Sequence, residues 1–290
     1  MPVVIVLEAI ALGIIQGLAE FMPISSSAHL VIVPWLFKWT SPVLTGLSFD
    51  VALHLGTLIA VLSFFARDWV RIVRAGFASI AERRIGADID RRLAWFLVVG
   101  CIPGGVAGVL AEKKIEELFH QPNVPISSAA IIAMAVIIAV WAIVLFAAER
   151  LASHTRGLET LSLKDTIVVG LAQALAIFPG VSRSGSTITA GLAIGLKRET
   201  AARFSFLLSA PIIAGAGLKS LWNIHASLAS GATTRSDLVL VGLGFVASAA
   251  SGYLCIRFLL RFLQRNSTNI FAYYRWTLAA VLIVAALLRG

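Results

Sequence analysis

Apolar stretches of about 20 residues recur along this chain and alternate with short polar connections. Each stretch is long enough to cross a hydrocarbon core of about 30 Å. The pattern predicts six uninterrupted membrane spans and two further apolar segments that are broken near their middle. The expected spans are residues 49–66, 93–111, 126–148, 202–221, 238–263 and 271–288.

The two broken segments, residues 2–37 and 166–196, are interrupted at Pro23 and at Pro179 with Gly180. Proline ends a helix because it has no N–H to donate and its ring clashes with the preceding turn. Residues 2–37 are too interrupted for two full spans, and the second segment resembles the first. We therefore expect two re-entrant hairpins of half-helices, buried in protein or lining a watery cavity.

The two halves of the chain resemble each other. A shift of 157 positions aligns Gly13/Gly170, Gln16/Gln173, Leu18/Leu175, Phe21/Phe178, Ser25/Ser182 and Ser27/Ser184. A weaker match at a shift of 144 aligns Gly100/Gly244 and Gly108/Gly252. Each half then holds one hairpin and three spans, so the halves have opposite orientations. The predicted fold is an all-α polytopic membrane protein with a single domain, residues 1–290, and an inverted repeat of about 1–150 and about 163–290.

Composition agrees with this class, because the chain is 59% hydrophobic and only 13% charged, about half the charge of a soluble domain. The net charge of +9 comes from the polar connections, so we expect a membrane protein that binds no nucleic acid. One side of the predicted membrane holds 17 Lys and Arg residues and the other holds 6. The positive-inside rule makes the first side cytoplasmic and places both termini outside.

Polar side chains gather at the first break. Gln16 and Glu20 are four positions apart and share one helix face. The second half-helix then begins with Ser25, Ser26 and Ser27, followed by His29. Ionisable groups at membrane depth are costly and indicate functional sites, whereas hydroxyls at a helix start cap N–H groups or bind anions.

The second break repeats the serines and adds a cation: Ser182, Arg183, Ser184 and Thr187. Two helix N-termini, one arginine and several hydroxyls predict a phosphate pocket. Simpler interpretations apply to single residues. A serine at a helix start is usually only a cap, and His54 within the first span is expected to be structural. His29 is expected to be functional because it lies beside Glu20 and the serines.

Three stretches, QGLAEFMPISSSAH, FDVALHLGTLIAV and PGVSRSGSTIT, resemble the signatures of the bacterial undecaprenyl pyrophosphate phosphatases of the bacitracin-resistance type. The resemblance covers essentially the whole chain, in order. It implies a hydrolase of the bacterial inner membrane that converts undecaprenyl diphosphate to undecaprenyl phosphate and inorganic phosphate. Such an enzyme recycles the lipid carrier of peptidoglycan synthesis and confers bacitracin resistance.

By motif position, the family's functional residues fall on Gln16 and Glu20 (the acidic pair), Ser25 and Ser26 (the serine pair), His29, and Arg183 (the phosphate-binding arginine), with Ser27, Ser182, Ser184 and Thr187 as further substrate-binding hydroxyls. Gln16 departs from a carboxylate, because an amide is neither a base nor a strong metal ligand. Glu20 is then the only carboxylate of the pair, and could hold Mg²⁺ or Ca²⁺, cations that prefer oxygen ligands.

We expect metal-assisted phosphoanhydride hydrolysis in which Arg183 binds phosphate oxygens and Ser26 is the nucleophile, with Glu20 or His29 accepting its proton. His29 as the nucleophile is an equally legal scheme. The alternative function is a polyprenyl-phosphate flippase that uses the same anion pocket without chemistry. The site is expected to open to the outer, periplasmic side. The sequence does not fix the oligomeric state, and a homodimer is one option.

Overall fold

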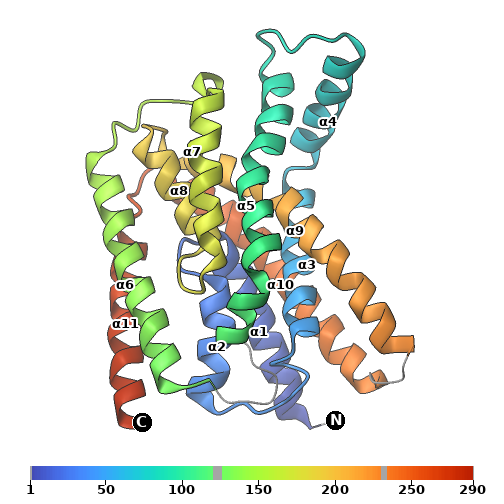
Figure 1. Cartoon of the computed structure of the whole chain (residues 1–290), viewed down its shortest axis with the longest axis vertical. Helices are drawn as coiled ribbons and strands as arrows, with labels where there is room; N and C mark the ends of the chain where they lie inside the picture. The colour runs from blue at the N-terminus through green and yellow to red at the C-terminus, as the bar shows by residue number, and fades with distance from the viewer. Residues whose placement is uncertain (1, 120–125, 230–233, 290) are drawn as a thin grey trace.

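The computed structural model describes residues 2–119, 126–229 and 234–289 of the chain (Figure 1). Within these residues the protein forms eleven α-helices and no β-strand. Six helices are long and apolar enough to cross a membrane, and the bent pair Ser48–Phe64 with Ala66–Ala81 adds a seventh possible span. Five of the six correspond to expected spans. The sixth, Val3–Phe21, was expected to be only half a span, and the expected span 49–66 passes only as part of the bent pair. The all-α polytopic membrane fold predicted from the sequence is therefore confirmed.

The first half of the chain contains α1 (Val3–Phe21), α2 (Ser26–Phe37), α3 (Leu47–Phe64), α4 (Ala66–Ala81), α5 (Ile89–Phe119) and α6 (Ser128–Leu151). The second half contains α7 (Leu163–Ala174), α8 (Arg183–Ala193), α9 (Arg198–Ala229), α10 (Arg235–Leu263) and α11 (Asn269–Arg289), with short 3-10 turns at Leu158–Thr160 and Leu175–Ile177.

Two helical hairpins, α1–α2 and α7–α8, enter the molecule from opposite ends (Figure 1). The break of the first follows Phe21, and that of the second lies between Ile177 and Arg183, as the prolines predict. Figure 1 shows the hairpin α1–α2 rising from the end that holds both termini and the hairpin α7–α8 descending from the other end. The tips touch, because Ser184 Oγ donates to the Met22 carbonyl at 3.0 Å.

Small residues let the hairpin helices approach their neighbours closely. α1 packs along α10, and α7 packs along α5. A Cβ atom on Gly13 would collide with the Gly244 carbonyl and would lie 2.8 Å from Ala247 Cβ. A Cβ atom on Gly170 would lie 2.7 Å from the Gly100 carbonyl. Glycine is therefore required wherever these backbones meet.

The largest buried apolar cluster fixes the end of α1. Phe21 is fully buried, and its ring packs edge-to-face on Phe206 of α9 with the ring centroids 5.2 Å apart. Such aromatic pairs contribute about 0.5–1.5 kcal/mol beyond the area that they bury. The packing of Phe21 holds the adjacent Glu20 in the interior.

The polar connection expected at residues 67–92 is largely helical, because α4 occupies Ala66–Ala81 and turns by 81° from α3. The buried side of α4 faces α5, where Trp95 Nε1 donates to Ser79 Oγ at 2.9 Å. Part of the charge of this region, Arg67 to Arg74, therefore lies on a helix, and the rest lies in the α4–α5 loop and at the start of α5. Two other expectations are corrected in the same way. The expected span 93–111 continues as a helix to Phe119, the end of α5, and residues 223–229, which follow the expected span 202–221, belong to α9.

We expect Gly13→Ala to lower the stability by about 1–3 kcal/mol, because the added methyl group overpacks the contact of α1 with α10. Gly242→Ala in α10 is the matched control, since a Cβ atom there meets nothing within 4 Å. Thermal unfolding of the two purified variants in detergent measures the difference. Equal melting temperatures would contradict the close approach.

Candidate active site

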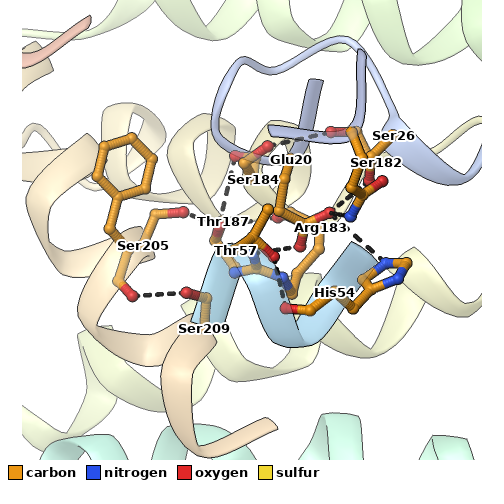
Figure 2. A network of polar contacts seen from close by, with 12 residues as sticks. Glu20, Ser26, His54, Thr57, Ser182, Arg183, Ser184, Thr187, Ser205 and Ser209 are labelled. Atoms are coloured by element: carbon orange, nitrogen blue, oxygen red, sulfur yellow. Dashed lines mark hydrogen bonds and ion pairs between the residues drawn. The ribbon is translucent and has the colours of Figure 1, made fainter. Parts of the chain in front are cut away.

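Glu20 is the centre of the polar cluster that the hairpins build (Figure 2). Its side chain is only 5% exposed. Glu20 Oε1 accepts from Arg183 Nη2 at 2.8 Å. Glu20 Oε2 accepts from Gln16 Nε2 at 3.0 Å and from Ser26 Oγ at 2.5 Å. The structure thus brings together four predicted site residues, from α1, from the start of α2 and from the start of α8.

His54 of α3 also faces this carboxylate (Figure 2). Its Nε2 lies 3.7 Å from Glu20 Oε2, and its Nδ1 donates to the Asp50 carbonyl at 2.7 Å. His54 was expected to be purely structural, and its position beside the Glu20 carboxylate corrects that expectation. His54 lies in FDVALHLGTLIAV, a stretch that carries part of the family resemblance. That place in the chain was the sequence signal that could have indicated a functional role.

His29 lies apart from Glu20. Its Nδ1 donates to the Ser25 carbonyl at 2.7 Å, and its Nε2 lies 2.7 Å from the Tyr274 hydroxyl. The two rings are stacked with centroids 5.8 Å apart. With Nδ1 donating, the Nε2 of a neutral imidazole accepts from the tyrosine. Both ring nitrogens are therefore engaged away from Ser26.

The two serines that precede the second helix of each hairpin share an unusual backbone. Ser25 has φ 76° and Ser182 has φ 75°, a left-handed conformation that costs a non-glycine residue about 1–3 kcal/mol. Ser182 Oγ caps α8 by accepting from the Gly185 N–H at 3.0 Å. Ser25 makes no such cap on α2. The first-turn N–H groups of α2 are thus left for an anion.

Arg275 of α11 connects the tips of the two hairpins. It is fully buried, and each of its five N–H donors points to a backbone carbonyl: Nε to Ile138 at 3.2 Å, Nη1 to Pro23 at 3.2 Å and Val181 at 3.1 Å, and Nη2 to Gly180 at 2.6 Å and Val181 at 3.2 Å. No signal in the sequence indicates this role, because Arg275 counts there as one more cytoplasmic charge. The carbonyls freed by both helix breaks are satisfied by this one side chain.

Most of the other predicted hydroxyl groups bind backbone carbonyls or one another. Ser184 Oγ binds the first tip, as described above. Thr187 Oγ1 donates to the Arg183 carbonyl at 2.8 Å and lies 2.6 Å from Ser205 Oγ of α9. Ser25 Oγ and Ser27 Oγ lie 3.4 Å apart. These contacts orient the loop around Arg183 and Ser26 and leave those two side chains to face Glu20.

Two buried polar atoms of the cluster have no hydrogen-bond partner among the described residues: Arg183 Nη1 and Gln16 Oε1. A buried group left in this state costs about 1–3 kcal/mol, so both atoms indicate where a ligand would bind. The guanidinium N–H groups match the geometry of phosphate oxygens. The cluster therefore offers a phosphoryl group a cation, helix N–H groups and a nearby hydroxyl.

The residues do not fit a divalent cation held by the protein alone. Both Glu20 oxygens already accept hydrogen bonds, and Gln16 supplies an amide rather than a second carboxylate. Across residues 2–119, 126–229 and 234–289, no group of three His, Cys, Asp or Glu side chains is arranged to hold a metal. Glu20 as a ligand of Mg²⁺ or Ca²⁺ stays a prediction.

The fold and the site define a multi-pass membrane protein whose polar centre, between two broken helices, suits phosphoryl chemistry. The family model described as Bacitracin resistance protein BacA matches residues 9–281. An undecaprenyl-diphosphatase of Thermomicrobium roseum is 48% identical over 278 residues, 96% of each chain. One of Moorella thermoacetica is 46% identical over 284 residues, 98% of this chain and 99% of that protein. The chain belongs to the BacA family, which confirms the resemblance.

We expect Arg275→Lys to lower the stability by about 2–5 kcal/mol, because three ammonium donors cannot satisfy the carbonyls that five guanidinium donors hold. Arg257→Lys on the exposed face of α10 is the control. Thermal unfolding in detergent gives the comparison. Similar melting temperatures for both variants would show that Arg275 does not hold the tips together.

Proposed function

We propose that this protein hydrolyses undecaprenyl diphosphate to undecaprenyl phosphate and inorganic phosphate, and so recycles the lipid carrier of peptidoglycan synthesis. Relatives that match this chain over almost its whole length are named undecaprenyl-diphosphatases. One observation carries the proposal in this chain. Ser26 donates to the Glu20 carboxylate at 2.5 Å, beside an arginine whose Nη1 has no partner among the described residues.

In the proposed reaction, Arg183 Nη1 and the first-turn N–H groups of α2 bind oxygens of the terminal phosphoryl group. Ser26 Oγ attacks its phosphorus while its proton passes to Glu20 Oε2. The bond to the bridging oxygen breaks, and the electron pair leaves with undecaprenyl phosphate. Water then attacks the phosphoserine and releases inorganic phosphate. Preorganised donors stabilise the charge that develops on the phosphoryl oxygens.

The geometry favours Ser26 over His29 as the nucleophile. Ser26 Oγ already touches the group that takes its proton, whereas His29 Nε2 accepts from the Tyr274 hydroxyl. A role for His29 through the position of the first tip fits its bond to the Ser25 carbonyl. The flippase alternative gains no support from the comparisons, because the relatives that match are named as hydrolases.

We further propose that the halves are an inverted repeat in the bacterial plasma membrane and that the site opens to the outer side. Gly13 of α1 packs against Gly244 of α10, and Gly170 of α7 packs against Gly100 of α5. The shift of 157 positions relates Gly13 to Gly170, and the shift of 144 positions relates Gly100 to Gly244, so the two contacts are equivalent in the two halves. Ser25 and Ser182, also related by the first shift, share one backbone conformation. The basic α4–α5 loop lies at the end opposite to both termini (Figure 1), in agreement with the positive-inside rule.

We expect Ser26→Ala to lose phosphate release from undecaprenyl diphosphate by about a thousandfold or more, because the attacking oxygen is removed. Arg183→Ala is expected to lower the rate of phosphate release by a similar factor. Ser63→Ala, on the exposed end of α3, is the control and should retain wild-type rates. Purified protein in detergent with a phosphate-release assay measures all three.

The nucleophile is identified by trapping the phosphoenzyme. Acid-quenched wild type should carry an acid-stable phosphoryl label on the peptide that contains Ser26. An acid-labile label that persists in Ser26→Ala would assign the attack to a histidine instead. Absence of phosphate release from wild type would refute the proposed function itself.

A further inference from the structure

The Glu20 carboxylate has no direct route for passing a proton to water. It is 5% exposed, and hydrogen-bond donors from Arg183, Gln16 and Ser26 surround its two oxygens. None of these three returns a proton to solvent. Arg183 keeps its proton at any relevant pH, the Gln16 amide does not titrate, and Ser26 is the source of the proton.

His54 is the remaining described group that faces Glu20 and also reaches the surface. Its side chain is 33% exposed, and its Nε2 lies 3.7 Å from Glu20 Oε2 (Figure 2). Because Nδ1 donates to the Asp50 carbonyl, the lone pair of the neutral imidazole is on Nε2 and points toward the carboxylate. That tautomer is ready to accept a proton from Glu20, and imidazole is the side chain best suited to do so near neutral pH.

We propose that His54 is the proton relay of this site, a positioning residue that acts on the reaction through Glu20. The proposal rests on the proposed phosphatase function. It also gives a reason why the amide at position 16 is compatible with catalysis: the second titratable group beside Glu20 comes from α3 instead of from α1.

When the Ser26 Oγ–phosphorus bond forms and the anhydride bond breaks, the hydroxyl proton moves to Glu20 Oε2 and then to His54 Nε2. In the second half-reaction, the water oxygen forms a bond to phosphorus, and both water protons leave with inorganic phosphate as dihydrogen phosphate. The Ser26 oxygen leaves and regains the proton from His54 through Glu20. His54 therefore holds one proton between the two halves of the cycle.

The charged groups around His54 suit a ring that changes its protonation. Glu20 faces it from α1, and Asp50 is close enough on its own helix to interact with its charge. Arg183 of α8 binds the far oxygen of Glu20. The helices α9 and α10, which also pack on α3, supply neutral hydroxyls to this region, among them Ser209 and Ser248. The positive ring is balanced by the Glu20 carboxylate, and the neutral ring leaves the pair of Glu20 and Arg183 intact.

The test is a rescue experiment on phosphate release by purified full-length protein, measured from pH 5.5 to 8.5. His54→Gln is expected to lower the rate at pH 7 by about ten- to a hundredfold, the lower range of general acid–base effects. The pH dependence of the rate should also differ from that of wild type, because the relay group is removed. His54→Asn is the second variant should the first not fold, with the melting temperature as the check.

Gln16→Glu in the His54→Gln background supplies the decisive comparison. It places a second carboxylate where the Gln16 amide now lies 3.0 Å from Glu20 Oε2, and two carboxylates at that distance share a proton. The double variant should recover at least tenfold of the lost rate, whereas a merely structural role for His54 predicts no recovery.

Two results would overturn the relay. One is a wild-type rate and pH profile in folded His54→Gln and His54→Asn. The other is a loss of rate that Gln16→Glu does not restore although the double variant is folded. Both results leave phosphate release by wild type intact, so they are distinct from a failure of the proposed function, in which wild type itself releases no phosphate.

Discussion

The structure depends on one guanidinium group that satisfies the backbone of both helix breaks. Interrupting a helix inside a membrane frees carbonyl groups that lipid cannot hydrogen-bond. Arg275 resolves this for the Pro23 turn and the Gly180–Val181 turn together, and its third anchor is Ile138 of α6. Because no carboxylate appears among these five contacts, the charge is stabilised by carbonyl dipoles alone. The tips, and with them the site, are held by a residue that need not touch a substrate.

The site also joins the two halves of the chain, through complementary charges. The first hairpin supplies the carboxylate of Glu20 and the hydroxyl of Ser26, and the second supplies Arg183. An incoming phosphate must share the guanidinium with Glu20, whose charge opposes any anion placed there. In the proposed reaction, the carboxylate is then weakened as a partner of Arg183 at the moment when it accepts the proton of Ser26.

The sequence predicted the helical class, the breaks at the prolines and most spans, because apolar length and proline placement are local signals. It also predicted that Glu20, Ser26 and Arg183 belong together, since they lie in the stretches that carry the family resemblance. It failed where the answer lies in tertiary contacts. Arg275 appears in the sequence as an ordinary basic residue, and neither its burial nor its carbonyl partners leave a trace there. His29 and His54 exchange their expected surroundings, because distance along the chain does not report which face of a helix meets Glu20.

The left-handed serines at the two tips have a further consequence. Ser25 and Ser182 adopt φ values near those that glycine reaches without strain, so each tip is held in a conformation that the isolated loop would abandon. The surrounding helices supply the free energy that keeps it there. The anion-binding backbone is consequently in place before any ligand arrives, and little conformational entropy is lost on binding. In this molecule rigidity is established during folding, and a diphosphate head group that enters from a fluid bilayer meets a surface that does not have to adjust.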